Sequence, residues 1–344
     1  MIKRWSLLGS LLLLLGCGVQ RPLPSTLSPT AIPPTATATL PPTETASPTA
    51  VPAVTAPPTA TPTVMSAPSP TATLLPTHTA TAEPQTAVPA ITRQSTVERW
   101  QNVAEYSFFS PSRQQEIRFT IYTPPNYDQS DEQYPVLYFL HGSQGSHILF
   151  WNAISREVTA ANEDAGGWIS GLIESGQIPP LIIVAPNDTD GGWGDTNKTM
   201  VTQELIQTID GNWRTIANRN GRSLAGFSMG AAGASRYPAK NPDLYCNTML
   251  LAESHVDEAA TLWAQNQDAI LASGLQVGLV VGELDTRGVN ATTAVQQILT
   301  ELKIPHELQI VPDVPHNFGQ LYNQIGVWAL QFHATCWQKY EAGD

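Results

Sequence analysis

The sequence has little positive charge and few charged residues of any kind. Its 17 Lys and Arg are outnumbered by 29 Asp and Glu, the formal net charge is -12, and 13% of the 344 residues are charged. No basic cluster stands out, so nucleic acid is not an expected partner. The histidines lie far apart, and neither H-E-x-x-H nor C-x-x-C occurs. We therefore expect no metal site and no other cofactor.

The hydrophobic run near the N-terminus, LLGSLLLLLG, is too short to span a bilayer. It follows two basic residues and has the length of a signal-peptide core. The tetrapeptide LLGC at residues 14–17 resembles the lipobox of bacterial lipoproteins, in which the cysteine is lipidated. We expect a lipoprotein signal peptide over residues 1–20, lipidation at Cys17, and an exported protein that is anchored to the cell membrane on its extracytoplasmic side. The alternative is an ordinary secretory signal that contains a cysteine by chance.

Large apolar residues are scarce from residue 21 to residue 91, where the chain is almost entirely Pro, Thr, Ala, Ser, Val and Leu. This composition offers too little apolar surface to offset the entropy of ordering the chain. We expect residues 21–91 to be a disordered linker with polyproline II character. The remaining residues 92–344 are long enough for one domain with a sizeable core.

The order of apolar runs after residue 92 predicts an α/β sheet. Several runs are unbroken, as in parallel strands that are covered on both faces. We expect about eight strands, mostly parallel, with helices on both faces. The single helical segment at 257–274 leaves no room for a large lid. Seven of these strands have clear ranges, at 117–127, 134–142, 180–187, 222–227, 247–254, 275–282 and 306–312, and the main helices are 166–176, 201–218 and 318–340.

Ser228 lies in a G-x-S-x-G pentapeptide, Gly226 to Gly230. This pattern fits the nucleophile elbow, a sharp turn from a strand into a helix that needs small flanking residues. A Gly- and Ala-rich bend is the alternative. The predicted strand before the serine and the small-residue helix start after it favour the elbow. The helix N-terminus would also direct N–H groups toward a developing oxyanion.

A nucleophilic serine needs a base and an acid, and in this fold they follow in the order serine, acid, histidine. Asp285 follows the strand 275–282, and His316 follows the last strand, so both are expected at the carboxyl edge of the sheet. Glu283 is the alternative acid, and Asp285 is favoured because it lies further into the loop. His255 is at the correct edge but precedes the acid. The remaining histidines considered as bases are less well placed: His78, His306 and His333.

The oxyanion hole needs two N–H groups. The backbone of Met229 supplies one, and the sharp turn after His141 and Gly142 allows the backbone of Ser143 to supply the other. His141 itself is interpreted as structural. Three tryptophans have two open interpretations, as aromatic walls of a substrate site or as core: Trp151, Trp193 and Trp263.

Two cysteines remain once Cys17 is lipidated. Cys246 begins a strand at the amino edge of the sheet, and Cys336 lies near the end of a helix that runs back toward that edge. An exported protein can keep a disulfide, so we predict one between Cys246 and Cys336.

Three segments carry a resemblance to a known family: YTPPNYDQSDEQYPVLYFLHG, QELIQTIDGNWRT and AGFSMGAAGA. They resemble the "putative esterase" family of α/β hydrolases, which includes esterase D-like, feruloyl and enterochelin esterases and the mycolyltransferases. The resemblance implies an α/β-hydrolase fold, a catalytic triad of Ser228, Asp285 and His316, and an ester substrate, with carbohydrate-linked esters among the candidates. The sequence departs from the family at Ala231, where a glycine is usual, and at Pro238, which should kink or shorten its helix.

Together these observations predict an exported, membrane-tethered serine esterase that acts through an acyl-enzyme on Ser228. Two alternatives stay open at the level of sequence. One is an acyltransferase that acts on a sugar hydroxyl, and the other is a non-catalytic surface-binding module with a hydrolase fold.

Overall fold

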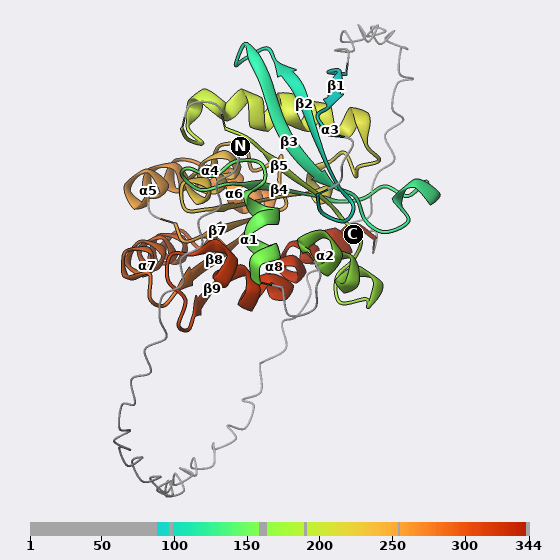
Figure 1. Ribbon diagram of the computed structural model, residues 1–344. Helices are drawn as coiled ribbons and strands as arrows, with labels where there is room; N and C mark the ends of the chain where they lie inside the picture. Colours follow the sequence, from blue (N-terminus) through green and yellow to red (C-terminus); the bar gives the residue numbers. More distant parts are fainter. Residues whose placement is uncertain (1–87, 96–98, 158–163, 189–190, 254, 342–344) are drawn as a thin grey trace, which may run out of the picture. The chain divides into compact units, whose positions relative to one another are not determined.

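The computed structural model describes residues 88–95, 99–157, 164–188, 191–253 and 255–341 (Figure 1). The predicted signal peptide, the predicted lipidation site Cys17, His78 and most of the predicted linker lie outside the described residues. The fold begins slightly earlier than the expected boundary at residue 92. A strand starts at Ile91, and the Asn212 side chain donates to the Pro89 carbonyl at 3.3 Å.

The nine strands of the described residues are β1 (Ile91–Arg93), β2 (Val103–Ser110), β3 (Gln115–Tyr122), β4 (Val136–Leu140), β5 (Ile182–Pro186), β6 (Arg222–Phe227), β7 (Asn247–Leu251), β8 (Gln276–Gly282) and β9 (His306–Val311). They form one sheet in the order β1-β2-β3-β5-β4-β6-β7-β8-β9. Strands β4 to β9 are parallel, and β1 to β3 are antiparallel to their neighbours. The prediction of a mostly parallel α/β sheet is confirmed.

Helices cover both faces of the sheet, as the unbroken apolar strands predict. Side chains of α1, α2 and α8 belong to one buried cluster, and those of α3 to α7 belong to the other (Figure 1). Strand β4 divides between them, since Phe139 faces the first cluster and Tyr138 the second. The helices are α1 (Leu149–Glu157), α2 (Ala165–Glu174), α3 (Leu205–Asn212), α4 (Met229–Lys240), α5 (Val256–Gln265), α6 (Gln267–Ser273), α7 (Thr286–Glu301) and α8 (Phe318–Glu341).

The sequence does not predict β1 and β2. Strand β2 reads VAEYSFFS, and its burial does not alternate, because Ser107 and Ser110 are buried as well as Phe108. The strand is held by pairing with β3 along its whole length, from Val103 opposite Tyr122 to Ser110 opposite Gln115. A hairpin of this kind depends on cross-strand contacts that a period-2 pattern does not reveal.

The expected helix 201–218 is wrong at its end. It ends at Asn212, and Trp213 has an extended backbone with φ -129° and ψ 157°. Trp213 packs against Tyr106 at 5.3 Å between ring centroids, so a contact with the β2–β3 hairpin replaces the expected helical one. Ile216 is buried, but in the loop before β6. Sequence periodicity cannot distinguish such loop positions from a helical face.

The connection between β7 and β8 consists of two short helices and not one. It breaks at Asn266, whose side chain donates to the Leu262 carbonyl at 2.8 Å. Trp263 in α5 and Ile270 in α6 are fully buried against the sheet. The described part of this connection therefore forms no lid over the carboxyl edge.

Pro238 lies inside α4, two residues before the helix ends at Lys240. In a regular helix the backbone N–H of residue 238 would donate to the Ala234 carbonyl. Proline has no N–H, so this hydrogen bond is missing. The Thr248 hydroxyl on β7 donates to that carbonyl at 2.7 Å, and all of these groups are buried. The neighbouring strand thus satisfies the group that the proline leaves unpaired.

A disulfide joins Cys246, just before β7, to Cys336 in α8, with Cα atoms 6.0 Å apart. Beside it, the Asn247 side chain donates to the His333 carbonyl at 3.1 Å and accepts from His333 Nδ1 at 2.8 Å. Burial lowers the pKa of His333 to about 3.

In the described part of the chain, no helix has both the length and the apolar character needed to cross a membrane.

Candidate active site

Ser228 occupies a sharp turn between β6 and α4. Its φ of 55° lies in the left-handed region that non-glycine residues rarely adopt. The flanking glycines make the turn possible. A Cβ at Gly226 would lie 2.1 Å from the Gly230 carbonyl oxygen, and a Cβ at Gly230 would lie 2.0 Å from that of Leu140. The turn therefore needs both glycines, and it presents the serine at the carboxyl edge of the parallel strands.

Three predicted residues from three loops lie within hydrogen-bonding distance of one another. His316 Nε2 is 3.0 Å from Ser228 Oγ, and His316 Nδ1 is 2.5 Å from Asp285 Oδ2. Asp285 is buried, and its other oxygen accepts from the Gly288 N–H at 2.9 Å, which caps α7. The carboxylate is thereby fixed at both oxygens while His316 stays partly exposed. This arrangement can pass a proton from the serine to the imidazole and stabilise the resulting imidazolium.

The alternative acid lies elsewhere. Glu283 is exposed, and its Oε2 accepts from the Asp313 N–H at 3.3 Å. In the part of the chain that the structure describes, no hydrogen bond joins Glu283 to His316. Its position stabilises the turn after β9.

The other histidines of the domain have separate surroundings. His255 is the N-cap residue that precedes α5, and a hydrogen bond with Glu253 raises the pKa of its imidazole. His306 lies at the amino end of β9, where its Nδ1 hydrogen-bonds the Ile304 carbonyl. His333 is buried beside the disulfide. Within the described residues, none of these three is hydrogen-bonded to Ser228.

The peptide between Gly142 and Ser143 lies beside the serine. A Cβ at Gly142 would lie 3.5 Å from Ser228 Cβ. The Gly142 carbonyl accepts from His141 Nδ1 at 2.9 Å and from the Gly145 N–H at 3.0 Å. The Gly142 C=O and the Ser143 N–H belong to one trans peptide, in which the two groups point to opposite sides. The two hydrogen bonds that hold the Gly142 carbonyl therefore direct the Ser143 N–H away from His141 and Gly145.

His141 is held in one tautomer. Its Nε2 accepts from the Asp188 N–H at 3.3 Å, so Nδ1 carries the proton that it donates to Gly142. Burial lowers the pKa of His141, which favours this neutral ring. Trp193 lies edge-on to the ring and donates its indole N–H to the His141 carbonyl at 2.8 Å. His141 thus has a specific structural role, because its ring orients the predicted oxyanion loop.

The second predicted donor, the Met229 N–H, begins α4 directly after Ser228. N–H groups in the first turn of a helix have no partner within the helix. Among the described residues, neither Met229 N–H nor Ser143 N–H donates a hydrogen bond to another protein group. Both are therefore available to a ligand at Ser228.

The three tryptophans considered as aromatic walls belong to the core. Trp151, Trp193 and Trp263 are at most 1% exposed, and each indole N–H has a buried acceptor. Sequence reasoning instead missed Phe227, the second residue of the G-x-S-x-G motif. Its ring centroid lies 4.8 Å from that of His316, so Phe227 packs against the imidazole.

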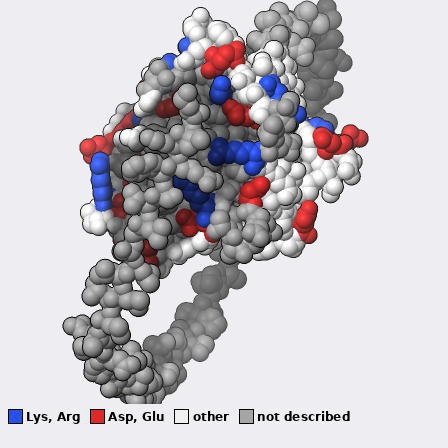
Figure 2. Space-filling model, viewed as in Figure 1, with Lys and Arg blue, Asp and Glu red and all other residues white. Residues whose placement is uncertain are grey.

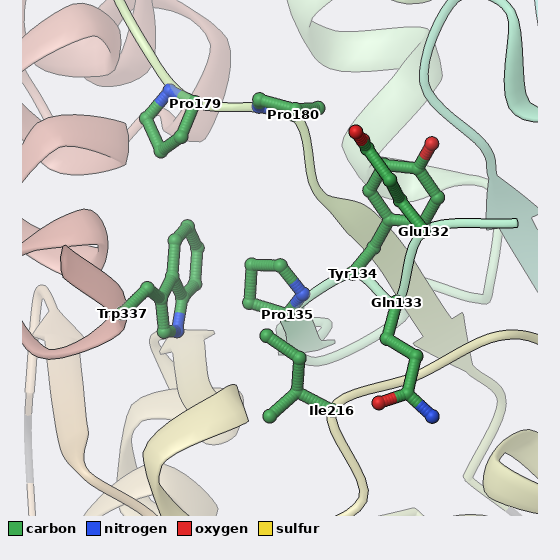
Figure 3. A pocket seen from close by; sticks show the side chains of 8 residues that line it. All are labelled: Glu132, Gln133, Tyr134, Pro135, Pro179, Pro180, Ile216 and Trp337. Atoms are coloured by element: carbon green, nitrogen blue, oxygen red, sulfur yellow. The ribbon is translucent and has the colours of Figure 1, made fainter. Parts of the chain in front are cut away.

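The pocket in Figure 3 is remote from this arrangement. It has a volume of about 260 Å³ and is lined by Pro135, Pro180 and Trp337, among others. Pro135 directly precedes β4, and Pro180 lies just before β5, so the pocket is at the amino edge of the sheet. Ser228 lies at the opposite, carboxyl edge.

Among the described residues, no group of three His, Cys, Asp or Glu side chains could hold a metal ion.

Comparison with known proteins gives consistent matches. A family model described as "Putative esterase" matches residues 110–332. Esterase Rv1288 of Mycobacterium tuberculosis is 31% identical over 198 residues, which are 51% of this chain and 38% of that protein. An endo-1,4-beta-xylanase/feruloyl esterase of Xylanibacter ruminicola is 29% identical over 157 residues, which are 42% of this chain and 20% of that protein. The chain therefore spans well under half the length of these relatives.

Two solved structures are also similar. A ferulic acid esterase superimposes with a TM-score of 0.59 at 19% identity, over 68% of this chain and 98% of that one. An S-formylglutathione hydrolase from Agrobacterium tumefaciens gives a TM-score of 0.51 at 17% identity, over 67% and 94%. These structures share the α/β-hydrolase fold with the domain described above.

Proposed function

The chain belongs to the "Putative esterase" family, and from that premise we propose that it is a serine carboxylic-ester hydrolase with Ser228 as nucleophile, His316 as base and Asp285 as acid. One observation carries the proposal. Hydrogen-bonding distances of 2.5 Å and 3.0 Å link Asp285, His316 and Ser228 in an unbroken series at the start of α4.

The first half of the reaction forms the acyl-enzyme. Ser228 Oγ attacks the ester carbonyl carbon while His316 Nε2 accepts the hydroxyl proton. The N–H groups of Met229 and Ser143 donate to the oxyanion of the tetrahedral intermediate. When the intermediate collapses, the C–O bond to the alcohol breaks, and His316 returns the proton to the departing oxygen.

The second half repeats these steps with water. His316 removes a proton from water as the water oxygen attacks the acyl carbon. Collapse of the second intermediate breaks the bond to Ser228 Oγ, which regains a proton from His316. Asp285 remains ionised throughout and stabilises the imidazolium in both halves.

The substrate we propose is an ester with a bulky part, such as an ester of a carbohydrate hydroxyl or of an aryl acid. The short helices α5 and α6 support this, because both pack against the sheet and the described β7–β8 connection holds no larger insertion. The feruloyl esterase names among the relatives and similar structures give further support.

We place the enzyme outside the cell membrane, tethered through lipidated Cys17 and the linker of residues 21–91. The LLGC tetrapeptide and the Pro- and Thr-rich composition support this placement. The Cys246–Cys336 disulfide also suits an oxidising compartment.

Labelling with a fluorophosphonate tests the proposal. The wild-type domain should be labelled and should hydrolyse short acyl, feruloyl or acetylated-sugar esters, and Ser228→Ala should do neither. A folded wild-type protein that is neither labelled nor active on any ester would support the binding-module alternative. Formation of new acylated sugar on addition of a sugar acceptor would instead favour acyl transfer over hydrolysis.

A further inference from the structure

A second cavity, of about 450 Å³, lies between the β2–β3 hairpin and the segment that follows the oxyanion loop. Glu105 and Arg118 line it from the hairpin, Arg99 and Trp100 from the turn before β2, and His147 from the segment after Ser143. Its volume lies within the range of small-molecule sites, roughly 300 to 1,000 Å³. Nothing in the proposed triad or oxyanion hole uses this cavity.

The cavity is close to the proposed reaction centre. Gly142 lies beside Ser228, and His147 follows Ser143 by four residues. Because a chain advances by at most about 3.5 Å per residue, His147 lies within roughly 14 Å of Ser143. The segment is also fixed, since the Thr120 hydroxyl donates to the His147 carbonyl at 2.7 Å. A subsite here requires an ester long enough to reach from Ser228 to the cavity.

The cavity has more positive than negative charge at its walls. Arg118 lies 3.6 Å from Glu105 Oε1, and the same oxygen is 3.0 Å from His147 Nε2. The Arg99 guanidinium lies 4.8 Å above the Trp100 ring, and no carboxylate of the described residues forms an ion pair with it. Among the described residues that line the cavity, Glu105 is thus the one carboxylate beside the two guanidinium groups of Arg99 and Arg118, in a chain with a formal net charge of -12. Figure 2 shows basic side chains near the middle of the face that carries α1 and the hairpin.

We propose that this cavity is a subsite for a carboxylate group of the ester substrate, held mainly by Arg118 with help from Arg99. The inference deepens the proposed function and rests on it. Guanidinium groups bind carboxylates through paired, charge-assisted hydrogen bonds. Glu105 at the same wall opposes a doubly charged phosphate more strongly than a singly charged carboxylate, so the carboxylate is favoured. The apolar lining, including Trp100 and Ile148, suits the carbon skeleton that carries it.

Two matched pairs of esters test the subsite. One pair carries the charge in the acyl part, the 4-nitrophenyl monoester of glutaric acid against 4-nitrophenyl pentanoate. The other carries it in the alcohol part, the butyrate ester of 4-hydroxyphenylacetate against that of 4-hydroxyphenylacetamide. The wild type should have the higher kcat/KM for the charged member of at least one pair. Arg118→Gln should lower the charged-to-neutral ratio about tenfold and Arg99→Gln by less, because a charged hydrogen bond is lost.

Lys303→Gln is the matched control. It removes the same charge from an exposed turn after α7, and the ratio should stay at its wild-type value. An unchanged ratio in both arginine variants would refute the subsite even if the neutral esters are hydrolysed normally. Failure to hydrolyse the neutral esters would instead refute the proposed function.

A binding measurement separates the two outcomes further. Calorimetry with Ser228→Ala should show that 4-hydroxyphenylacetate or glutarate binds, and that adding Arg118→Gln weakens the affinity about tenfold. Equal affinity with and without Arg118→Gln, or no binding of either carboxylate, would overturn the subsite without reference to turnover.

Discussion

Asp285 contacts His316 Nδ1 through one carboxylate oxygen at 2.5 Å and caps α7 through the other, where the Gly288 N–H donates at 2.9 Å. The same side chain thus fixes the start of a helix and the orientation of the imidazole. A carboxylate that is held at both oxygens cannot rotate away from His316. The position of Asp285 at the carboxyl end of β8 therefore determines where His316 meets Ser228.

Asp285→Asn should lower turnover by about 10⁴-fold, because an amide stabilises the wrong tautomer of the imidazole and cannot offset the imidazolium charge. The asparagine oxygen can still accept from Gly288, so the fold should be retained. The measurement is kcat on one activated ester, with circular dichroism to check folding.

Glu283→Gln is the control for this prediction, since Glu283 contacts the Asp313 backbone and is exposed. It should leave kcat near the wild-type value. A severe loss in Glu283→Gln beside a near-normal Asp285→Asn would move the acid two residues back along the chain.

His141 should act as a positioning residue for the oxyanion loop. His141→Ala removes the ring N–H that holds the Gly142 carbonyl, so the Ser143 N–H should lose its orientation. Loss of one oxyanion donor costs about 10²-fold in kcat with little effect on KM. His141→Asn should recover part of kcat, because its amide N–H can reach the same carbonyl. A packing defect alone would give no recovery in Asn over Ala, and that result would contradict the assigned role.

His333 should make the protein less stable in acid. Burial lowers the pKa of His333 to about 3 in the folded state, and the unfolded pKa is about 6.5. The folded state thus favours the neutral ring. The stability that this provides is fully present above about pH 6.5 and is lost as the pH falls toward about 3, by up to about 1.4 kcal/mol per pH unit.

His333→Gln should weaken this dependence, because an amide N–H can still donate to Asn247 Oδ1 but does not titrate between about pH 6 and about pH 4. Urea unfolding of both proteins over that range gives the two slopes. Parallel slopes would show that His333 does not contribute to the acid sensitivity.

The parallel half of the sheet follows from the sequence, because each strand from β4 to β8 is an apolar run between turn residues. The three predicted triad residues also follow, since loops after parallel strands meet at one edge. Their roles stay predictions until activity is measured. The hairpin strand β2 could not be predicted from the pattern of apolar and polar residues, because its burial reflects pairing with β3 and not alternation.

Tertiary contacts explain the remaining differences. Trp213 leaves the expected helix to pack on Tyr106, a residue more than a hundred positions earlier in the chain. Trp193 could not be placed from sequence, because its indole N–H finds a buried acceptor only once the loop is folded onto His141. The cavity beside Arg118 also could not be predicted from the sequence, because its walls come from three separate segments that meet only in the folded protein.

The pairing of Pro238 with Thr248 gives a prediction about stability alone. Thr248→Val keeps the shape of the side chain but removes the hydroxyl that satisfies the Ala234 carbonyl, and the carbonyl is then buried without a partner. Such a group costs about 1–3 kcal/mol. Pro238→Ala restores an N–H that can bond the same carbonyl within α4, so Thr248→Val should cost clearly less in that background. Urea unfolding of the wild type, both single variants and the double variant measures the coupling. If Thr248→Val costs the same with and without Pro238, the threonine does not replace the missing helical donor, and the proline must be tolerated for another reason.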